Sequence, residues 1–172
     1  MVEIFTINSK NIILRLPNLS DVKDLLEIYS DRETMELYGS NVNNDYILLQ
    51  NTILDFNYKF TQYEKIYCVI ESKEDLKVIG FILINYLEYE WQLEFAINKN
   101  YRNKGYASQA IDLLLNFCKE NGLNKILAKA QVHNSNSIVI LKKFGFIPRE
   151  NKFYTIVNDQ QYLALYFDKV LK

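Results

Sequence analysis

Glycine and proline are scarce in this sequence, with five glycines and two prolines among 172 residues. So low a content excludes collagen-like chains and disordered chains rich in these two residues. No apolar run approaches the roughly 18–20 residues that span a bilayer. The first residues also lack the basic segment and apolar core of a signal peptide. We therefore expect a soluble cytoplasmic protein that does not enter the membrane.

Cysteine and histidine are scarcer still. Cys68 and Cys118 lie fifty residues apart without any metal-binding spacing, so we expect both to be reduced thiols. His133 is the one histidine, and no cysteine or second histidine adjoins it to form a metal site or a catalytic triad. We expect no metal, and we expect a surface or capping role for His133.

Apolar residues are plentiful, at 49% of the chain, and charged residues make up 24%. This amount suffices for one core, and the length fits one domain over residues 1–172. Charge is unevenly distributed: residues 21–90 hold 14 acidic and 6 basic side chains, whereas residues 91–172 hold 6 acidic and 12 basic ones. This asymmetry indicates either a site for two ligands of opposite charge or a scattered, solvated surface.

The spacing of apolar residues predicts an α/β protein with a mixed sheet. Its strongest helix spans residues 104–121, where an apolar stripe recurs at helical spacing and Gly122 follows as a stop. The other expected elements are a strand over 12–16, a helix capped by Ser20, a short helix from Asp31 to Gly39, a weak helix over 44–60, strands over 66–70, 78–86, 91–97 and 126–132, a helix capped by Asn134 or Ser135, and a hairpin of strands 153–157 and 162–167 around Asn158 and Asp159.

One of the five glycines, Gly105, stands at the start of that strongest helix, where it weakens the helix by about 1 kcal/mol. The free N–H groups of a helix start favour anions, and Lys99, Arg102 and Lys104 add positive charge nearby. A glycine lets a phosphate approach backbone nitrogen closely. The segment matches neither a Walker loop nor a dinucleotide fingerprint. From these residues alone, a polyphosphate site and a plain basic surface both remain open.

Three spaced motifs resemble the acetyl-CoA-dependent N-acetyltransferases of the GNAT superfamily, in particular the branch of the Rim ribosomal-protein acetyltransferases. The motifs are Arg102-x-x-Gly105-x-Ala107 after a strand, Asn134-x-x-Ser137, and Lys143-Phe144-Gly145-Phe146. The resemblance covers nearly the whole chain and is weakest over residues 40–65. It implies a mixed, mostly antiparallel central sheet flanked by helices, acetyl-CoA as co-substrate, and direct acetyl transfer to a primary amine in a ternary complex.

The resemblance also implies where coenzyme A binds. The pyrophosphate would lie on backbone N–H groups of the Arg102–Ala107 turn, and the pantetheine arm would run beside the preceding strand. Asn134 would bind the pantetheine chain, and Ser137 would lie close to the thioester sulfur; capping of the following helix is compatible with both contacts. The implied coenzyme-binding residues are Phe95, Ala96, Ile97, Arg102, Asn103, Lys104, Gly105, Tyr106, Ala107, Asn134 and Ser137.

Acetyl transfer needs a neutral amine, whereas a lysine-like amine has a pKa of about 10.4, so a group must accept its proton. The candidate is Glu94, which alternates with the apolar residues Leu93, Phe95 and Ile97 and so points to the opposite face of the sheet. The resemblance places this face near the thioester. An exposed strand carboxylate without a catalytic role is the alternative interpretation.

Two positions depart from the family pattern. The tyrosine that often returns a proton to coenzyme A is replaced by Leu141, which moves this role to Ser137 or water. The glutamate that some N-terminal acetyltransferases carry five residues before the asparagine is replaced by Lys129. The catalytic candidates are therefore Glu94 and Ser137.

The acidic part of the chain is rich in tyrosine, a combination that suits a cationic amine such as a protein N-terminus, a polyamine or an aminoglycoside. The tyrosines are Tyr29, Tyr38, Tyr46, Tyr58, Tyr63 and Tyr67. The alternative is that these tyrosines belong to the core and that the acids are solvated. A non-catalytic coenzyme A-binding regulatory module is the main rival function. A pI near 5.9 argues against a nucleic-acid-binding domain. An exposed final hairpin would suit a homodimer.

Overall fold

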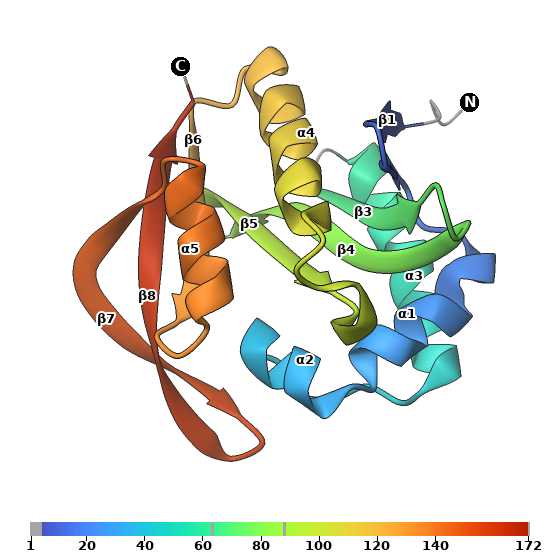
Figure 1. Ribbon diagram of the computed structural model, residues 1–172, viewed down its shortest axis with the longest axis horizontal. Helices are drawn as coiled ribbons and strands as arrows, with labels where there is room; N and C mark the ends of the chain where they lie inside the picture. The colour runs from blue at the N-terminus through green and yellow to red at the C-terminus, as the bar shows by residue number, and fades with distance from the viewer. Residues whose placement is uncertain (1–4, 63, 88, 172) are drawn as a thin grey trace.

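The computed structural model describes residues 5–62, 64–87 and 89–171. Within these residues the strands form one eight-stranded sheet in the order β1-β2-β3-β4-β5-β6-β8-β7 (Figure 1). The strands are β1 Thr6–Asn8, β2 Ile12–Arg15, β3 Lys65–Ser72, β4 Lys77–Leu87, β5 Glu90–Ile97, β6 Lys125–Gln131, β7 Ile147–Val157 and β8 Gln160–Val170. Neighbours pair antiparallel except β5 and β6, which are parallel. The predicted mixed, mostly antiparallel sheet is confirmed.

Helices cover both faces of this sheet. They are α1 Val22–Tyr29, α2 Arg32–Tyr38, α3 Tyr46–Thr61, α4 Tyr106–Glu120 and α5 Ser135–Lys143. One apolar core joins the sheet to α4 and α5, and a second joins the other face to α1 and α3. In Figure 1, α1 and α3 lie together on the right, while α5 packs against β6 on the left. The thiols of Cys68 and Cys118 are free, as predicted, and both are buried in the first core.

Local signals explain where several elements begin and end. Asp31 caps α2 by accepting the Thr34 N–H, and Gly39 ends this helix at φ +93°, a conformation that favours glycine. Asn158 and Asp159 both have positive φ in the turn between β7 and β8, as a tight two-residue hairpin requires. These three predicted boundaries are confirmed.

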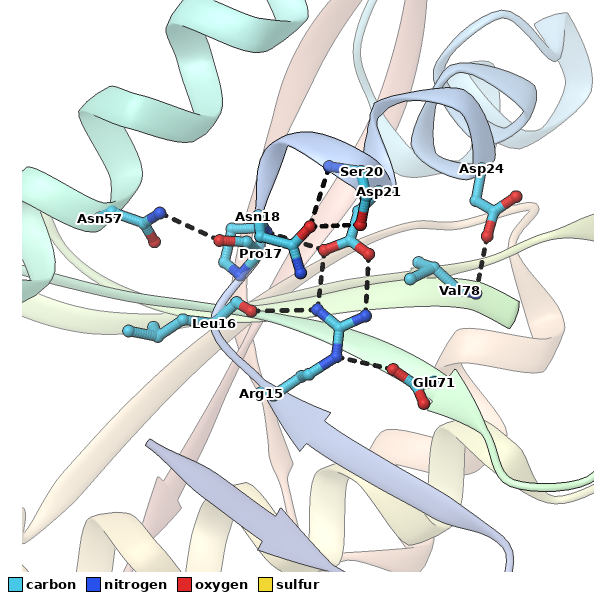
Figure 2. Close-up of polar contacts among 10 residues, drawn as sticks. All are labelled: Arg15, Leu16, Pro17, Asn18, Ser20, Asp21, Asp24, Asn57, Glu71 and Val78. Atoms are coloured by element: carbon cyan, nitrogen blue, oxygen red, sulfur yellow. Dashed lines mark hydrogen bonds and ion pairs between the residues drawn. The ribbon is translucent and has the colours of Figure 1, made fainter. Parts of the chain in front are cut away.

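A polar network attaches the first helix to the sheet (Figure 2). The Arg15 guanidinium donates to both carboxylate oxygens of Asp21, at 2.7 and 2.8 Å, and to Glu71 at 2.6 Å. These hydrogen bonds raise the pKa of Arg15. Asp21 is only 5% exposed, and the Arg15 guanidinium pairs its buried carboxylate. The network joins β2, the turn before α1, and β3.

Four details of the sequence prediction were wrong. Strand β1 was not expected; it pairs with β2 across a short hairpin. Ser20 does not cap a helix: Asn18 caps a 3-10 turn, Leu19–Asp21, in a reciprocal capping box with Asp21, and α1 follows. Helix α4 begins at Tyr106, directly after Gly105, and not at residue 104 as predicted. Strand β7 begins at Ile147, because its pairing with β8 continues past an irregularity between Pro148 and Lys152.

Candidate functional site

The parallel strands β5 and β6 separate after a short stretch of pairing. Gln92 pairs with Leu127 and Leu93 with Ala128, and no further pairs join the two strands in the described part of the chain. Each strand nevertheless continues for several residues, to Ile97 and Gln131 respectively. One edge of each strand is therefore left without a neighbouring strand, and its backbone N–H and C=O groups need other partners.

A cavity of about 490 Å³ occupies this split. Its wall combines the end of α2, strand β5, the loop before α4, strand β6, the start of α5 and the β7–β8 hairpin. The lining residues are Thr34, Leu37–Ser40, Leu93–Ile97, Arg102, Asn103, Ala107, Lys129–Gln131, Asn134, Asn136, Ser137, Ile140, Phe153, Thr155 and Ala164. A cavity of this volume has the size of a small-molecule site.

The loop from Arg102 to Gly105 enters this wall just before α4. Asn103 and Gly105 both have positive φ, at +61° and +80°, and Gly105 is the N-cap of α4. A Cβ built on Gly105 would have no other atom within 4 Å, so the space above this residue is open. The glycine is needed for its backbone conformation, and the free N–H groups of the first turn of α4 follow directly.

The positive charge near this loop is largely paired. Lys99 forms an ion pair of 2.6 Å with Asp31, and Arg102 forms one of 2.6 Å with Glu33 while donating to the Thr34 hydroxyl at 2.7 Å. Burial opposes ionisation of Asp31, but the hydrogen bonds from Lys99 and Thr34 outweigh it and hold its pKa at about 2. In Figure 1, α2 accordingly lies below the loop that joins β5 to α4.

These ion pairs change the interpretation of the cations. Lys99 and Arg102 attach the loop to α2, so their charge is not free for a ligand in this arrangement. Lys104 differs, because its exposed ammonium lies 5.2 Å from the centroid of the Tyr101 ring and no carboxylate among the described residues pairs with it. Of the three cations near Gly105, only Lys104 remains available to a polyphosphate.

The predicted coenzyme-binding residues meet in one region. Phe95, Ala96 and Ile97 line the cavity from the separated part of β5, and Ala107 lines it from the first turn of α4. Tyr106 is different: its side chain is only 8% exposed and belongs to the core. Lys104 and Gly105 stand in the loop next to the cavity but do not line it. The cavity wall thus holds the predicted set except Lys104, Gly105 and Tyr106.

Asn134 and Ser137 line the same cavity from α5. The Asn134 side chain accepts the Ser137 N–H at 3.1 Å and donates to the Leu37 carbonyl at 3.1 Å, so it caps α5 and holds the end of α2. An asparagine amide has a second N–H and a second lone pair, which leaves capacity for a ligand. Among the described residues, the Ser137 hydroxyl has no hydrogen-bond partner.

Glu94 lies on the face of β5 opposite to Leu93, as predicted, and its carboxylate lines the cavity. The Tyr38 hydroxyl at the end of α2 donates a hydrogen bond to this carboxylate. Burial, and then the charge of Glu94, raise the pKa of Tyr38 well above its usual value, so Tyr38 stays protonated as a donor. The ring of Tyr38 packs edge-on against Phe81 at 5.2 Å, which fixes its position.

The expected acidic, tyrosine-rich acceptor pocket is not found among the described residues. Glu94 is the one carboxylate that they contribute to the cavity wall, and no acid of residues 21–90 lines it. Three acids of that segment instead pair with cations of the later half of the chain: Asp31 with Lys99, Glu33 with Arg102, and Glu90 with both Lys125 and Arg149. Glu27 pairs within the segment, with Lys77. Part of the charge asymmetry is therefore used in internal contacts.

The tyrosines of this segment have several different roles. Tyr67 is a core residue, and Tyr29 stacks on Phe81 at 5.0 Å, with its hydroxyl 3.0 Å from that of Tyr67. Tyr46 and Tyr58 are exposed on α3, and Tyr63 lies outside the described residues. Of the six tyrosines, Tyr38 lines the cavity.

Sequence reasoning missed two residues of β6 in the cavity wall. Gln131 is 3% exposed; its Nε2 donates to the Thr155 hydroxyl at 3.3 Å, whereas its Oε1 is buried without a partner among the described residues. Lys129 lies two residues earlier on the same face. In the sequence it stood out only because it replaces the glutamate that some N-terminal acetyltransferases carry at this position. The alternation of β6 could have placed both on the face of Glu94.

The structure reveals neither a metal cluster nor a membrane helix in the described part of the chain. No three His, Cys, Asp or Glu side chains there are grouped so as to hold a metal ion. None of the helices in that part is long and apolar enough to span a membrane. His133 is exposed and its ring lies 5.2 Å from that of Tyr162, which agrees with the predicted surface position.

Comparisons with known proteins agree with this architecture. Residues 11–147 match the model of the acetyltransferase (GNAT) domain. The uncharacterized N-acetyltransferase YnaD of Bacillus subtilis is 26% identical over 170 residues, covering 92% of this chain and 95% of its own.

Solved structures agree as well. The ribosomal-protein-S5-alanine acetyltransferase of Vibrio fischeri superposes with a TM-score of 0.85 at 15% identity, over 98% of this chain and 97% of its own. The RimL ribosomal L7/L12 α-N-protein acetyltransferase in complex with coenzyme A superposes with a TM-score of 0.82 at 14% identity, over 97% and 98%. The family model covers well over half of the residues, and the resemblance seen in the three motifs is confirmed. The chain belongs to the GNAT family of acetyltransferases, and it is an acyltransferase.

Proposed function

We propose that this protein transfers the acetyl group of acetyl-CoA directly to a primary amine, with both substrates bound at once in the split between β5 and β6. The observation that carries the proposal is that one cavity joins the loop before α4 to the Glu94 carboxylate. A thioester held from one side and an amine held from the other would meet in such a cavity. Bringing two reactants together in this way removes much of the entropic barrier.

The coenzyme would occupy the side of the split next to α4 and α5. Its pyrophosphate would lie on the backbone N–H groups between Arg102 and Ala107, where two residues have positive φ and the space above Gly105 is open. Its pantetheine arm would pair with the free edge of Phe95–Ile97 and contact the Asn134 amide. The similar fold of RimL, solved with coenzyme A, supports this placement.

The chemistry requires a proton to leave the amine and another to reach the sulfur. Glu94 would accept the proton of the ammonium, either directly or through a water molecule, with Tyr38 holding the carboxylate in place. The amine nitrogen then attacks the thioester carbon, the C–N bond forms and the C–S bond breaks. Backbone N–H groups of β5 would stabilise the carbonyl oxygen during this step. As the intermediate collapses, the nitrogen loses a second proton and the thiolate gains one; the Ser137 hydroxyl, which has no other partner in the described residues, or a water molecule would relay it.

An amine screen tests this proposal directly. The protein would be incubated with acetyl-CoA and, separately, peptide N-termini, polyamines, aminoglycosides and amino acids, and the release of free coenzyme A would be followed with a thiol reagent. Mass spectrometry would check that the amine gains one acetyl group. We expect amine-dependent release above the slow hydrolysis without acceptor. If acetyl-CoA binds but no amine in any class is acetylated, the protein is a coenzyme A-binding module and the proposal is wrong.

A further inference from the structure

The charges at the mouth of the split restrict the acceptor. Leu93 and Ala128 form the last pair between β5 and β6, and both are buried in the core that α4 and α5 cover. Because successive side chains of a strand alternate between faces, the next residues, Glu94 and Lys129, emerge together on the opposite face. They stand on the two separating strands, and both line the cavity. A carboxylate and an ammonium thus flank the split, yet they form no ion pair with each other in the described structure.

Lys129 is positioned by aromatic rings and not by a carboxylate. Its Nζ lies 5.4 Å from the centroid of the Tyr166 ring and 6.0 Å from that of Phe153. These two rings stack on each other with their centroids 4.2 Å apart, so the ammonium lies near a pair of packed aromatic rings. No described carboxylate lies within ion-pair distance of this ammonium. The other cation in the wall, Arg102, is already paired with Glu33, so Lys129 is the cation of the wall that a ligand can still reach.

One atom of a second side chain in the same wall lacks a hydrogen-bond partner among the described residues. Gln131, two residues after Lys129 and on the same face, is 3% exposed and has an unpartnered Oε1. A buried polar atom without a hydrogen bond is unfavourable, so the Gln131 amide would gain by turning its Oε1 toward a ligand N–H. The wall therefore offers the Glu94 carboxylate, and the Gln131 amide once it has turned, as acceptors for N–H groups of a ligand, and one donor, Lys129, for an anion.

We propose that the acceptor is an amine that also carries an anionic group, a carboxylate or a phosphate, and that Lys129 binds this anion while the amine faces Glu94. The inference rests on the proposed acetyl transfer and specifies its acceptor. Substrates with several positive charges, such as polyamines, are disfavoured because Lys129 repels a second ammonium at the site. A zwitterionic molecule matches both charges at once.

Matched acceptor pairs test the inference. Each pair has the same amine with and without the anion: an amino acid and its carboxamide for the carboxylate, and phosphoethanolamine and ethanolamine for the phosphate. We expect kcat/KM to favour the anionic member of at least one series by about tenfold or more, and the series that responds identifies the anion. Tenfold corresponds to about 1.4 kcal/mol.

Two variants assign this preference to the lysine. Lys129→Glu should reverse it, because the introduced carboxylate repels the anion, and Lys129→Gln should abolish it. Lys142→Glu, which makes the same charge change at an exposed position of α5 outside the cavity wall, should leave it unchanged. Acetyl-CoA binding measured by calorimetry should be the same in all four proteins, which shows that they are folded.

The possible failures are distinguishable. If the wild-type protein acetylates both members of each pair equally, or if Lys129→Glu leaves the preference unchanged, the inference is overturned while acetyl transfer stands. The inference is also overturned if these pairs are inert but uncharged or polycationic amines are acetylated. If no amine at all is acetylated, the proposed function fails together with it.

Discussion

The Tyr38 hydroxyl donates a hydrogen bond to the Glu94 carboxylate, joining the end of α2 to the middle of β5 across 56 positions of sequence. The contact places a neutral donor on one oxygen, Oε2, of the proposed base, which lines the cavity. It also holds the end of α2, a helix of only seven residues, beside the split.

Replacement of the proposed base should slow the reaction without weakening coenzyme binding. We expect Glu94→Gln to lower kcat by about 10²–10⁴-fold, since the amide cannot accept the amine proton. The amide oxygen can still accept the Tyr38 hydrogen bond, so the fold should be kept. Steady-state rates and acetyl-CoA calorimetry on the same preparation would measure both. A kcat within twofold of the wild type would rule out Glu94 as the base.

Alanine variants of Ser137 and Asn134 should distinguish an effect on catalysis from an effect on helix capping. Ser137→Ala keeps the backbone N–H that Asn134 caps, so we expect unchanged stability and a lower kcat if the hydroxyl returns the proton to sulfur. Asn134→Ala removes the cap and should destabilise the protein by about 1 kcal/mol while weakening acetyl-CoA binding. Urea unfolding and calorimetry would measure these effects. Unchanged kcat in Ser137→Ala would assign the proton to water.

The ion pair between Asp31 and Lys99 should give stability that disappears in acid. The folded-state pKa of Asp31 is about 2, below the value of about 3.9 for an unfolded chain. A lowered carboxyl pKa stabilises the folded protein above the unfolded value and loses this effect as pH falls through the folded value. The excess stability of the wild type over Asp31→Asn should therefore be full above about pH 5 and shrink between pH 4 and pH 2. Thermal unfolding across this range would measure it; a constant difference would contradict the assignment.

The network of Arg15 should matter far more than an exposed pair. Asp21→Asn leaves the half-buried guanidinium with one carboxylate instead of two, and we expect a loss of about 1.5–3 kcal/mol. Asp55→Asn breaks the exposed helical pair with Lys59 and should cost only about 0.3–0.5 kcal/mol. Urea unfolding of both variants provides the comparison. Equal losses would mean that the network of Figure 2 adds no stability beyond that of a surface pair.

The sequence predicted the parts of the site that depend on local pattern. Gly105 at the start of α4, the Asn134 cap and the alternation that turns Glu94 to one face all follow from spacing within a few residues. Contacts between distant segments could not be predicted in this way. The pairing of Lys99 and Arg102 with acids of α2 depends on a packing geometry that spans about seventy positions, and so the sequence indicated free cations where the structure has ion pairs.

The same limit applies to the cavity wall. The Oε1 of Gln131 is buried without a partner among the described residues, beyond the point where β5 and β6 separate, and no local signal marks this separation. Lys129 was recognisable in the sequence only as a departure from a family pattern. The register of β5 and β6 is what places Lys129 opposite Glu94.

The most direct test of the central claim is isothermal titration of acetyl-CoA into the wild type, Gly105→Glu and Gly122→Glu. The two glycines stand at opposite ends of α4, have φ of +80° and +83°, and both face open space, so the substitutions introduce the same charge with similar backbone strain. Glutamate at 105 should weaken binding at least about tenfold, since like charges about 4 Å apart repel by about 1 kcal/mol in water and about 4 kcal/mol near a protein surface.

We expect one-to-one binding to the wild type and to Gly122→Glu, and little or none to Gly105→Glu in a protein that remains folded. Equal binding by all three would place the pyrophosphate elsewhere. No binding by the folded wild type would contradict the proposed use of acetyl-CoA itself.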